Sequence, residues 1–388
     1  VVWHSNNDDV VMVNATIDPV LDVPAQVIRL RLLNGSSQRF FNVGLSDNQT
    51  FYQIGSDDGL LSETNAVNRL QIAPGERVEL LLDLSGMEEQ SLHLMSYAAE
   101  FPNGIYGATY PGMMSMMTLN GYNPNPMNGN NFNILELNVV EQTDNPVTTM
   151  PTTLVDVTPI PESAAELTRT LTFTPEVMGP NALNGKFYIN GVSFDMNTIN
   201  YTIPMGNVEI WSLTNQSPTA HPFHIHDVHF YILDRDGNPP PASEQGRKDV
   251  LFVPAMSTVR FITQFTDFAD EVPYMYHCHM LVHEDDGMMG QFVVEDEVTY
   301  LSEEDMLSTA FVAYPNPLNN SSKELNIKTN DPIQSVMLVD LSGRTVLEQE
   351  TSEAITAMSL DLSYLSKGIY LINVVTGRGI HSDKIIMF

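Results

Sequence analysis

One short stretch of the chain gathers the residue types that a redox-active metal site needs. It runs Tyr-His-Cys-His-Met-Leu-Val-His and holds Cys278, the only cysteine, between His277 and His279. His283 follows five residues after the cysteine, and Met288 follows ten residues after it. One thiolate, imidazoles and a weak thioether form the ligand set of a blue-copper electron-transfer site.

A second cluster of histidines lies upstream, in the sequence His-Pro-Phe-His-Ile-His that ends at His226. Successive side chains of a strand point to opposite faces, so His224 and His226 share one face and His221 can occupy the other. By the same rule Cys278 points away from its two flanking histidines. We therefore predict two metal sites joined by a few covalent bonds. The mononuclear site would use His221, Cys278 and His283, with Met288 as axial ligand, and a second, catalytic centre would use His224, His226, His277 and His279.

Other residues have weaker arguments for a role. A carboxylate next to the cluster, Glu284, could relay protons or could be an ordinary surface acid. The methionines within residues 113–117 offer thioethers suited to Cu(I), but methionine also serves as adaptable packing. A closed zinc site could use the same residue types, although four ligands complete it and more are gathered here. We expect no metal at the remaining histidines, His4, His93, His229 and His381.

The overall composition restricts the classes of function. The chain has 48 acidic and 17 basic side chains and a formal charge of −31, so it would repel the phosphates of nucleic acids. Its 43% of hydrophobic residues indicate a globular protein. No apolar run approaches the roughly 18 residues of a membrane span. The first residues lack the basic start and apolar core of a signal peptide. We expect that a leader was removed or that the chain begins within a longer protein.

Short runs of β-branched and aromatic residues alternate with Asn-Gly, Asp-Gly and proline turns, which is typical of all-β sandwiches. The pattern divides the chain into residues 1–142, a linker at 143–163, residues 164–297, an acidic linker at 298–310, and residues 311–388. Strands with their turns are expected near residues 28–35, 51–59, 70–83, 187–192, 334–340 and 368–374.

The two histidine clusters closely resemble the last-domain signatures of multicopper oxidases, in the branch of cuprous oxidases, spore-coat laccases and bilirubin oxidases. The first block is similar to the middle cupredoxin domain of these enzymes, through Arg-Leu-Arg-Leu-Leu-Asn-Gly at residues 29–35 and Ala-Pro-Gly-Glu-Arg at residues 73–77. The resemblance covers about residues 10–297. It implies two cupredoxin-like Greek-key β-sandwiches and an activity that couples one-electron oxidation of substrates to reduction of O2 to water.

Position by position, the resemblance matches these residues to the three copper types of the family. His221, Cys278 and His283 match type 1 ligands with Met288 axial, His224 matches a type 2 ligand, and His226, His277 and His279 match type 3 ligands. Glu284 matches the proton-relay acid of the cuprous oxidases.

Two features depart from the family. Three-domain members complete the trinuclear cluster with two further His-x-His pairs in a first cupredoxin domain, and this sequence has no other such pair. We expect that domain to be missing here or to lie on another chain, so the type 2 and type 3 sites are only half-supplied. The Met- and His-rich insert of the cuprous oxidases is also absent, which leaves phenols and Cu(I) as alternative substrates.

The third block resembles the C-terminal sorting domain of the type IX secretion system of Bacteroidetes. The resemblance rests on Tyr-Pro-Asn-Pro at residues 314–317, Gly-Arg at 343–344 and Lys-Gly-Ile-Tyr at 367–370. It implies a small β-sandwich, the type IX machinery as partner, and a secreted or cell-surface location.

We therefore predict a multicopper oxidase that oxidises small reducing substrates with O2 as acceptor. Electrons would enter at the edge formed by His221 and His283 and pass through Cys278. The main alternative is a copper-binding electron-transfer module without oxygen reduction. A trimeric nitrite reductase fits poorly, because that family lacks histidine on both sides of the cysteine. A non-catalytic surface protein would have no need of the intact cysteine and histidines.

Overall fold

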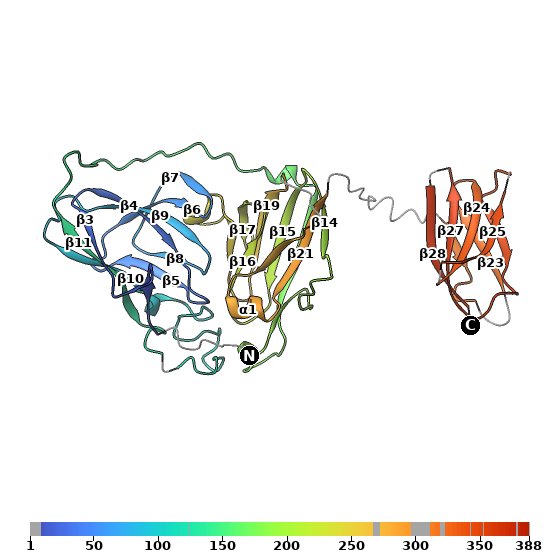
Figure 1. Ribbon diagram of the computed structural model, residues 1–388, viewed down its shortest axis with the longest axis horizontal. Coiled ribbons are helices and arrows are strands. Elements are labelled where there is room, and N and C mark those ends of the chain that lie inside the picture. Colours follow the sequence, from blue (N-terminus) through green and yellow to red (C-terminus); the bar gives the residue numbers. More distant parts are fainter. Residues whose placement is uncertain are drawn as a thin grey trace. The chain divides into compact units, whose positions relative to one another are not determined.

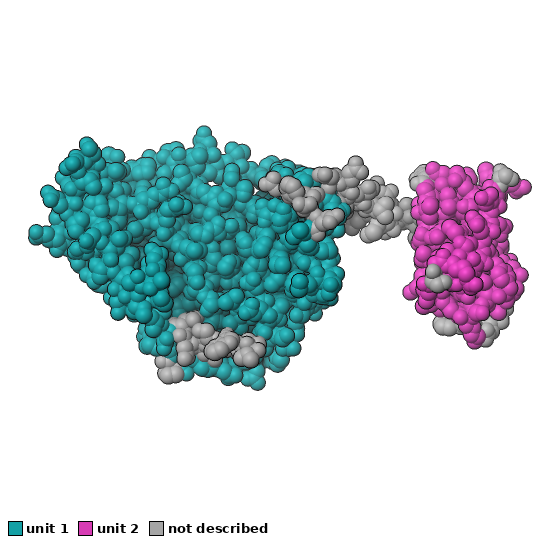
Figure 2. Space-filling model, viewed as in Figure 1, with its two compact units in different colours: residues 1–298 teal, residues 299–388 magenta. Residues whose placement is uncertain are grey.

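The computed structural model describes residues 9–123, 125–266, 272–295, 311–318, 323–341, 343–351, 353–377 and 379–387. The predicted acidic linker at 298–310 and His4 lie outside these residues. The chain divides into two compact units, residues 1–298 and 299–388 (Figure 2). Within the described residues β-structure dominates, and the one α-helix, α1 (Leu281–Asp285), has five residues. No helix in the described part of the chain is long and apolar enough to cross a bilayer.

The first unit begins with a β-sandwich, here called the first sandwich (Figure 1). One sheet has the order β3-β11-β10-β5-β8 and the other the order β4-β9-β6-β7, and a hairpin of β1 and β2 precedes them. Leucine and valine side chains from both sheets form its core. The strands are β1 (Met12–Val13), β2 (Thr16–Ile17), β3 (Val20–Pro24), β4 (Val27–Leu33), β5 (Phe41–Leu45), β6 (Phe51–Ser56), β7 (Gly59–Val67), β8 (Leu70–Ile72), β9 (Arg77–Asp83), β10 (Ser91–Tyr97) and β11 (Asn131–Val140).

The prediction of one strand across residues 70–83 was wrong. The segment forms two strands, β8 and β9, which belong to different sheets. Proline and glycine at the centre of the segment interrupt it, because Pro74 has no N–H to donate and Gly75 adopts a φ of +86°. Glu76 closes the turn, since its carboxylate accepts a hydrogen bond from the backbone N–H of Ala73 at 2.6 Å.

The second sandwich follows in the same unit. Its sheets have the orders β13-β12-β15-β19-β17 and β14-β21-β20-β16-β18. Its core is rich in aromatic rings, with Trp211 fully buried between Phe223 and Phe261. The strands are β12 (Leu167–Pro175), β13 (Phe187–Ile189), β14 (Tyr201–Pro204), β15 (Val208–Asn215), β16 (His221–Ile225), β17 (Phe230–Arg235), β18 (Val250–Val253), β19 (Thr258–Gln264), β20 (Tyr274–Cys278) and β21 (Met289–Glu295).

The second unit is a smaller sandwich with sheets β22-β23-β26 and β25-β24-β27-β28. Its own apolar core includes Leu325, Val336 and Ile372. The strands predicted near residues 334 and 368 are confirmed as β24 and β27. The bounds are β22 (Phe311–Tyr314), β23 (Glu324–Thr329), β24 (Ile333–Asp340), β25 (Thr345–Glu350), β26 (Ala357–Asp361), β27 (Gly368–Thr376) and β28 (Gly379–Met387).

Candidate copper centre

The two histidine clusters meet because β16 and β20 are neighbours in one sheet. The strands are antiparallel, and their register pairs His224 with His277 and Phe223 with Cys278. Side chains alternate between the two faces of the sheet. The thiol and the flanking imidazoles therefore leave β20 on opposite sides, as the alternation of the sequence predicts.

The first group of donors consists of His221, Cys278 and His283, all buried. The Cys278 sulfur lies 3.6 Å from Nδ1 of His221 and 3.5 Å from Nδ1 of His283. The two Nδ1 atoms are 3.1 Å apart. A metal at roughly 2.0–2.3 Å from nitrogen and sulfur donors in a trigonal plane requires donors roughly 3.5 Å apart. The spacing of these atoms fits a trigonal site with one thiolate and two imidazoles, the arrangement typical of blue copper.

Neighbouring groups fix the orientation of these rings. Ser217 donates its hydroxyl hydrogen to the carbonyl of Thr219 at 2.9 Å and lies 2.8 Å from Nε2 of His221. The serine oxygen can then accept the Nε2–H, which leaves the lone pair on Nδ1 free for a metal. The ring of Phe187 packs on His221 and His283 at centroid distances of 4.7 and 4.5 Å.

The path of the backbone after α1 places Met288 next to this first group of donors. The short helix α1 carries His283, and the chain turns at Gly287, whose φ is +95°. The carbonyl of Met288 then accepts a hydrogen bond from the backbone N–H of Cys278 at 3.0 Å, and its side chain is fully buried. The predicted axial ligand is thus held beside the cysteine, and its coordination remains a prediction.

The second group of donors consists of His224, His226 and His277, whose nitrogen atoms lie within 4.8 Å of one another. Their ring centroids are separated by 5.1 to 5.4 Å. His279 lies beside this group but outside it, with its ring 5.7 Å from that of His224 and 5.6 Å from that of His277. All four rings therefore lie at one site, with the ring of His279 slightly farther from the others.

Hydrogen bonds at Nδ1 orient two of these rings. His224 donates its Nδ1–H to the carbonyl of Asp249 at 2.8 Å. Nδ1 of His277 lies 3.1 Å from the carbonyl of Cys278 and 3.3 Å from a carboxylate oxygen of Glu284. Because carbonyls and carboxylates accept hydrogen bonds, both rings carry the proton on Nδ1 and present Nε2 to a metal.

The protonation states favour metal binding. Burial lowers the pKa of His283 to about 3 and that of His226 to about 4, where neighbouring histidines add to the shift. Burial also lowers the pKa of His221, His224 and His279. These imidazoles are neutral at pH 7 and have lone pairs available. Burial instead raises the pKa of the Cys278 thiol, so this ligand must lose its proton when a metal binds.

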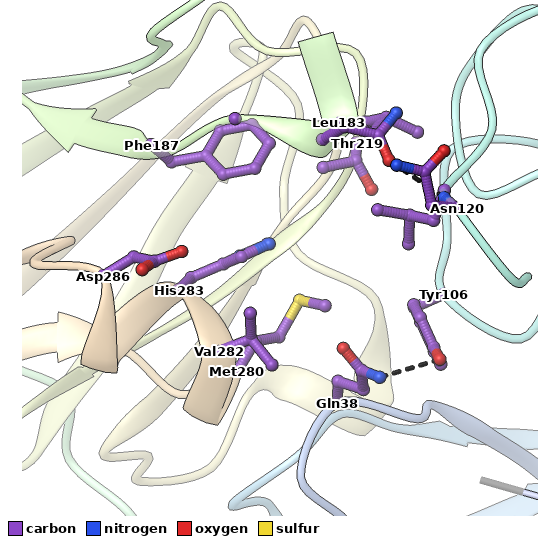
Figure 3. Close-up of a pocket in the computed structure, with 13 residues that line it drawn as sticks. Gln38, Tyr106, Asn120, Leu183, Phe187, Thr219, Met280, Val282, His283 and Asp286 are labelled. Carbon is purple, nitrogen blue, oxygen red and sulfur yellow. Dashed lines mark hydrogen bonds between the residues drawn. The ribbon is translucent and has the colours of Figure 1, made fainter. Parts of the chain in front are cut away.

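Beside His283 there is a small cavity of about 100 Å³ (Figure 3). The second sandwich contributes Phe187, Met280 and His283 to its walls. The first sandwich contributes Gln38 and Tyr106, whose amide and hydroxyl are joined by a 2.7 Å hydrogen bond. The cavity lining mixes apolar side chains with about as many polar ones, including Asp286. Its volume is smaller than the roughly 300–1,000 Å³ of most sites for organic molecules.

Comparisons with known proteins agree with this geometry. The family model for a multicopper oxidase domain matches residues 161–298. This chain carries a multicopper oxidase domain. A multicopper oxidase of Staphylococcus haemolyticus is 31% identical over 293 residues, which cover 74% of this chain and 52% of that protein. The family implies copper as cofactor, and both groups of donors fit it.

Two further relatives extend the comparison. The structure of a laccase-like multicopper oxidase from an Ochrobactrum species has a TM-score of 0.60 and 31% identity, covering 73% of this chain and 59% of that one. The cell division protein FtsP of Photorhabdus laumondii is 29% identical and covers 73% of this chain and 54% of that protein. The chain spans about half the length of the curated relatives that it matches.

The model for a secretion system C-terminal sorting domain matches residues 312–387. The second unit is therefore a sorting domain and indicates secretion, with attachment at the cell surface.

Other candidate residues lie elsewhere. His229 pairs with Asp58 at 2.9 Å rather than with a donor group. His93 and His381 are near Glu136 and Thr376. Met113, Met114 and Met116 are at least 45% exposed in a loop. The orienting roles of Ser217 and of the Asp249 carbonyl were not predicted from the sequence. Nothing in the sequence signals a backbone acceptor, whereas a serine four residues before a ligand histidine is a usable clue.

Proposed function

We propose that this chain forms the substrate-oxidising site and part of the oxygen-reducing site of a laccase-type multicopper oxidase. The observation that carries the proposal is the convergence of the Cys278 sulfur with two imidazoles on one face of the sheet, directly beside imidazoles on the other face. An isolated electron-transfer protein needs only the first of these groups.

The division into two sites follows the donor geometry, and the copper types assigned to each residue follow the resemblance to multicopper oxidases. His221, Cys278 and His283 would hold the type 1 copper, with Met288 as the axial ligand. His224 would serve the type 2 site, and His226, His277 and His279 the type 3 site. Bound copper supplies one-electron redox chemistry, which links oxidation of the substrate to reduction of O2. Cys278 shares peptide bonds with His277 and His279, so the chain itself provides a short covalent path between the two groups.

The cavity beside His283 supports a small organic reductant as substrate. Its walls offer the Phe187 ring for an aromatic face and the amide and hydroxyl pair of Gln38 and Tyr106 for a polar group. These two features favour a small phenol. Cu(I) is the second substrate class, for which the exposed methionines of residues 113–117 would be the soft donors.

Glu284 is the proposed proton donor for oxygen reduction. Burial is the largest influence and opposes its charged form, but the hydrogen bond from His277 and the charges of the neighbouring histidines together outweigh burial and lower the pKa of this carboxyl. The side chain is 29% exposed and reaches the second group of donors through His277. It is thus placed to exchange protons with solvent on one side and with the centre on the other.

The oxygen-reducing site needs more histidines than this sequence supplies, and a further cupredoxin domain in the same protein or on a partner chain would provide them. The alternative function is electron transfer without oxygen reduction, for which the first group of donors alone would suffice.

Oxygen uptake with a phenol decides between these functions. The copper-loaded protein, tested together with whatever domain precedes or accompanies it, should consume O2, and Cys278→Ser should not. Reduction of the blue copper by the phenol without O2 consumption would favour the electron-transfer alternative. Equal O2 consumption by the Cys278→Ser protein would refute the proposed electron route.

A further inference from the structure

The turn between β8 and β9 brings the first sandwich against a candidate copper ligand. Gly75 lies at the centre of this turn with a φ of +86°. A Cβ added there would lie 2.6 Å from Cδ2 and 2.7 Å from Nε2 of the His279 ring. Hydrogen bonds fix the turn, because Gly75 N–H donates to the carbonyl of Asn34 at 2.9 Å and Asn34 N–H donates to that of Glu76 at 3.1 Å. The imidazole therefore rests on a rigid backbone surface that only glycine permits.

A second contact reaches His224. Arg77, the first residue of β9, donates from its guanidinium to the Asp249 carboxylate, with Nη2 2.7 Å from Oδ2. The same guanidinium donates to the backbone carbonyl of Asp57 at 2.7 Å. The carbonyl of Asp249 accepts the Nδ1–H of His224. Arg77 thus holds the residue that sets the tautomer and orientation of this ring.

Buried charges support the same segment. Lys248, which precedes Asp249, lies 2.9 Å from the Asp57 carboxylate and 3.0 Å from that of Glu76. The Asp57 carboxylate also accepts the backbone N–H groups of Asp249 and Val250 at 3.4 and 3.3 Å. The main chain that carries the hydrogen-bond acceptor of His224 is therefore clamped by residues of the first sandwich.

We propose that the first sandwich, which contributes no donor to either group among its described residues, positions the second copper centre. Gly75 sets the place of the His279 ring, and Arg77 with Asp57 sets the orientation of His224 through Asp249. The inference rests on the proposed function of these histidines as ligands. Groups that hold a ligand ring in place raise its metal affinity. Without them the ring rotates freely, and ordering it on metal binding costs free energy.

Two variants with matched controls test the proposal. Gly75→Ala places a methyl group against His279, whereas Gly86→Ala has a similar φ of +74° and no atom within 4 Å of the new Cβ. Arg77→Met removes the contact with Asp249, whereas Arg29→Met removes an exposed ion pair in β4. Equilibrium dialysis would measure copper stoichiometry and affinity, and electron paramagnetic resonance would separate blue from non-blue Cu(II).

Gly75→Ala and Arg77→Met should bind copper at the second centre about 10- to 100-fold more weakly. Their blue absorption should match that of the wild type, which shows that the second sandwich is folded. Both controls should bind copper like the wild type. Wild-type affinity in both test variants, or loss of both copper signals together, would overturn the positioning role. A wild-type protein that binds only the blue copper even together with the domain that would supply the remaining histidines would instead refute the proposed function of the second group, and the inference with it.

Discussion

Replacing Lys248 with methionine should strongly destabilise the second sandwich. The ammonium group lies between the carboxylates of Asp57 and Glu76, and these three side chains are 4%, 0% and 8% exposed. The substitution keeps the apolar stem but leaves two buried carboxylates without their nearest cation. Removing one partner of a buried ion pair costs about 3–5 kcal/mol, against about 0–1 kcal/mol for an exposed pair. We expect the free energy of unfolding to fall by about 3–5 kcal/mol.

Urea titration followed by the fluorescence of Trp211, which is fully buried in the second sandwich, would measure this loss. Lys186→Met is the matched control, because Lys186 is exposed, and its effect should stay within about 0.5 kcal/mol. The double variant Lys248→Met/Glu76→Gln should recover part of the stability, since it removes one of the unpaired charges. A loss below about 1 kcal/mol in the single variant would refute this account of the network.

The stability of the single variant Lys248→Met should also depend on pH, in a direction that the environment of Glu76 predicts. Burial raises the pKa of Glu76 even with Lys248 present, although the ammonium opposes the shift. Without the ammonium the folded-state pKa rises further above the unfolded value, so the folded state binds more protons. The variant should therefore gain stability relative to the wild type as the pH falls from about 7 to about 5.

Three further outcomes are expected at the copper sites. Ser217→Ala should weaken copper binding at the blue site about 10- to 100-fold in a chelator competition, because His221 loses its orienting partner; unchanged affinity would contradict this role. Glu284→Gln should keep the blue absorption and slow O2 consumption by about 10²- to 10⁴-fold in a preparation that consumes O2, and a wild-type rate would exclude it as proton donor. Filling the blue site at pH 7 should release about one proton, from Cys278, in a pH-stat measurement, whereas no release would indicate a preformed thiolate.

The donor groups could be predicted from the sequence because they depend on local rules. The strict alternation of side chains in a strand separates Cys278 from His277 and His279, and the same rule joins His224 to His226. Once β16 and β20 lie next to each other as antiparallel strands, these side chains come together in two groups, one on each face of the sheet. Prediction failed at residues 70–83, where the apolar pattern continues through a turn that moves the chain from one sheet to the other.

The supporting contacts could not be predicted because they join residues far apart in the sequence. Arg77 and Asp249 are separated by 172 positions, and the acceptor for His224 is a backbone carbonyl that any residue would supply. The fit of Gly75 against His279 likewise depends on how two sandwiches of one unit pack. The spacing of residues within the two histidine clusters does not indicate these contacts between the sandwiches.

Copper titration of the purified chain, followed by visible absorption, tests the central claim most directly. The close approach of the Cys278 sulfur to Nδ1 of His221 and His283 predicts an intense blue absorption that saturates with one copper per chain. The Cys278→Ser variant should stay colourless while its histidine group on the opposite face still binds Cu(II). Copper binding without blue absorption in the wild type, or blue absorption in the variant, would contradict the account.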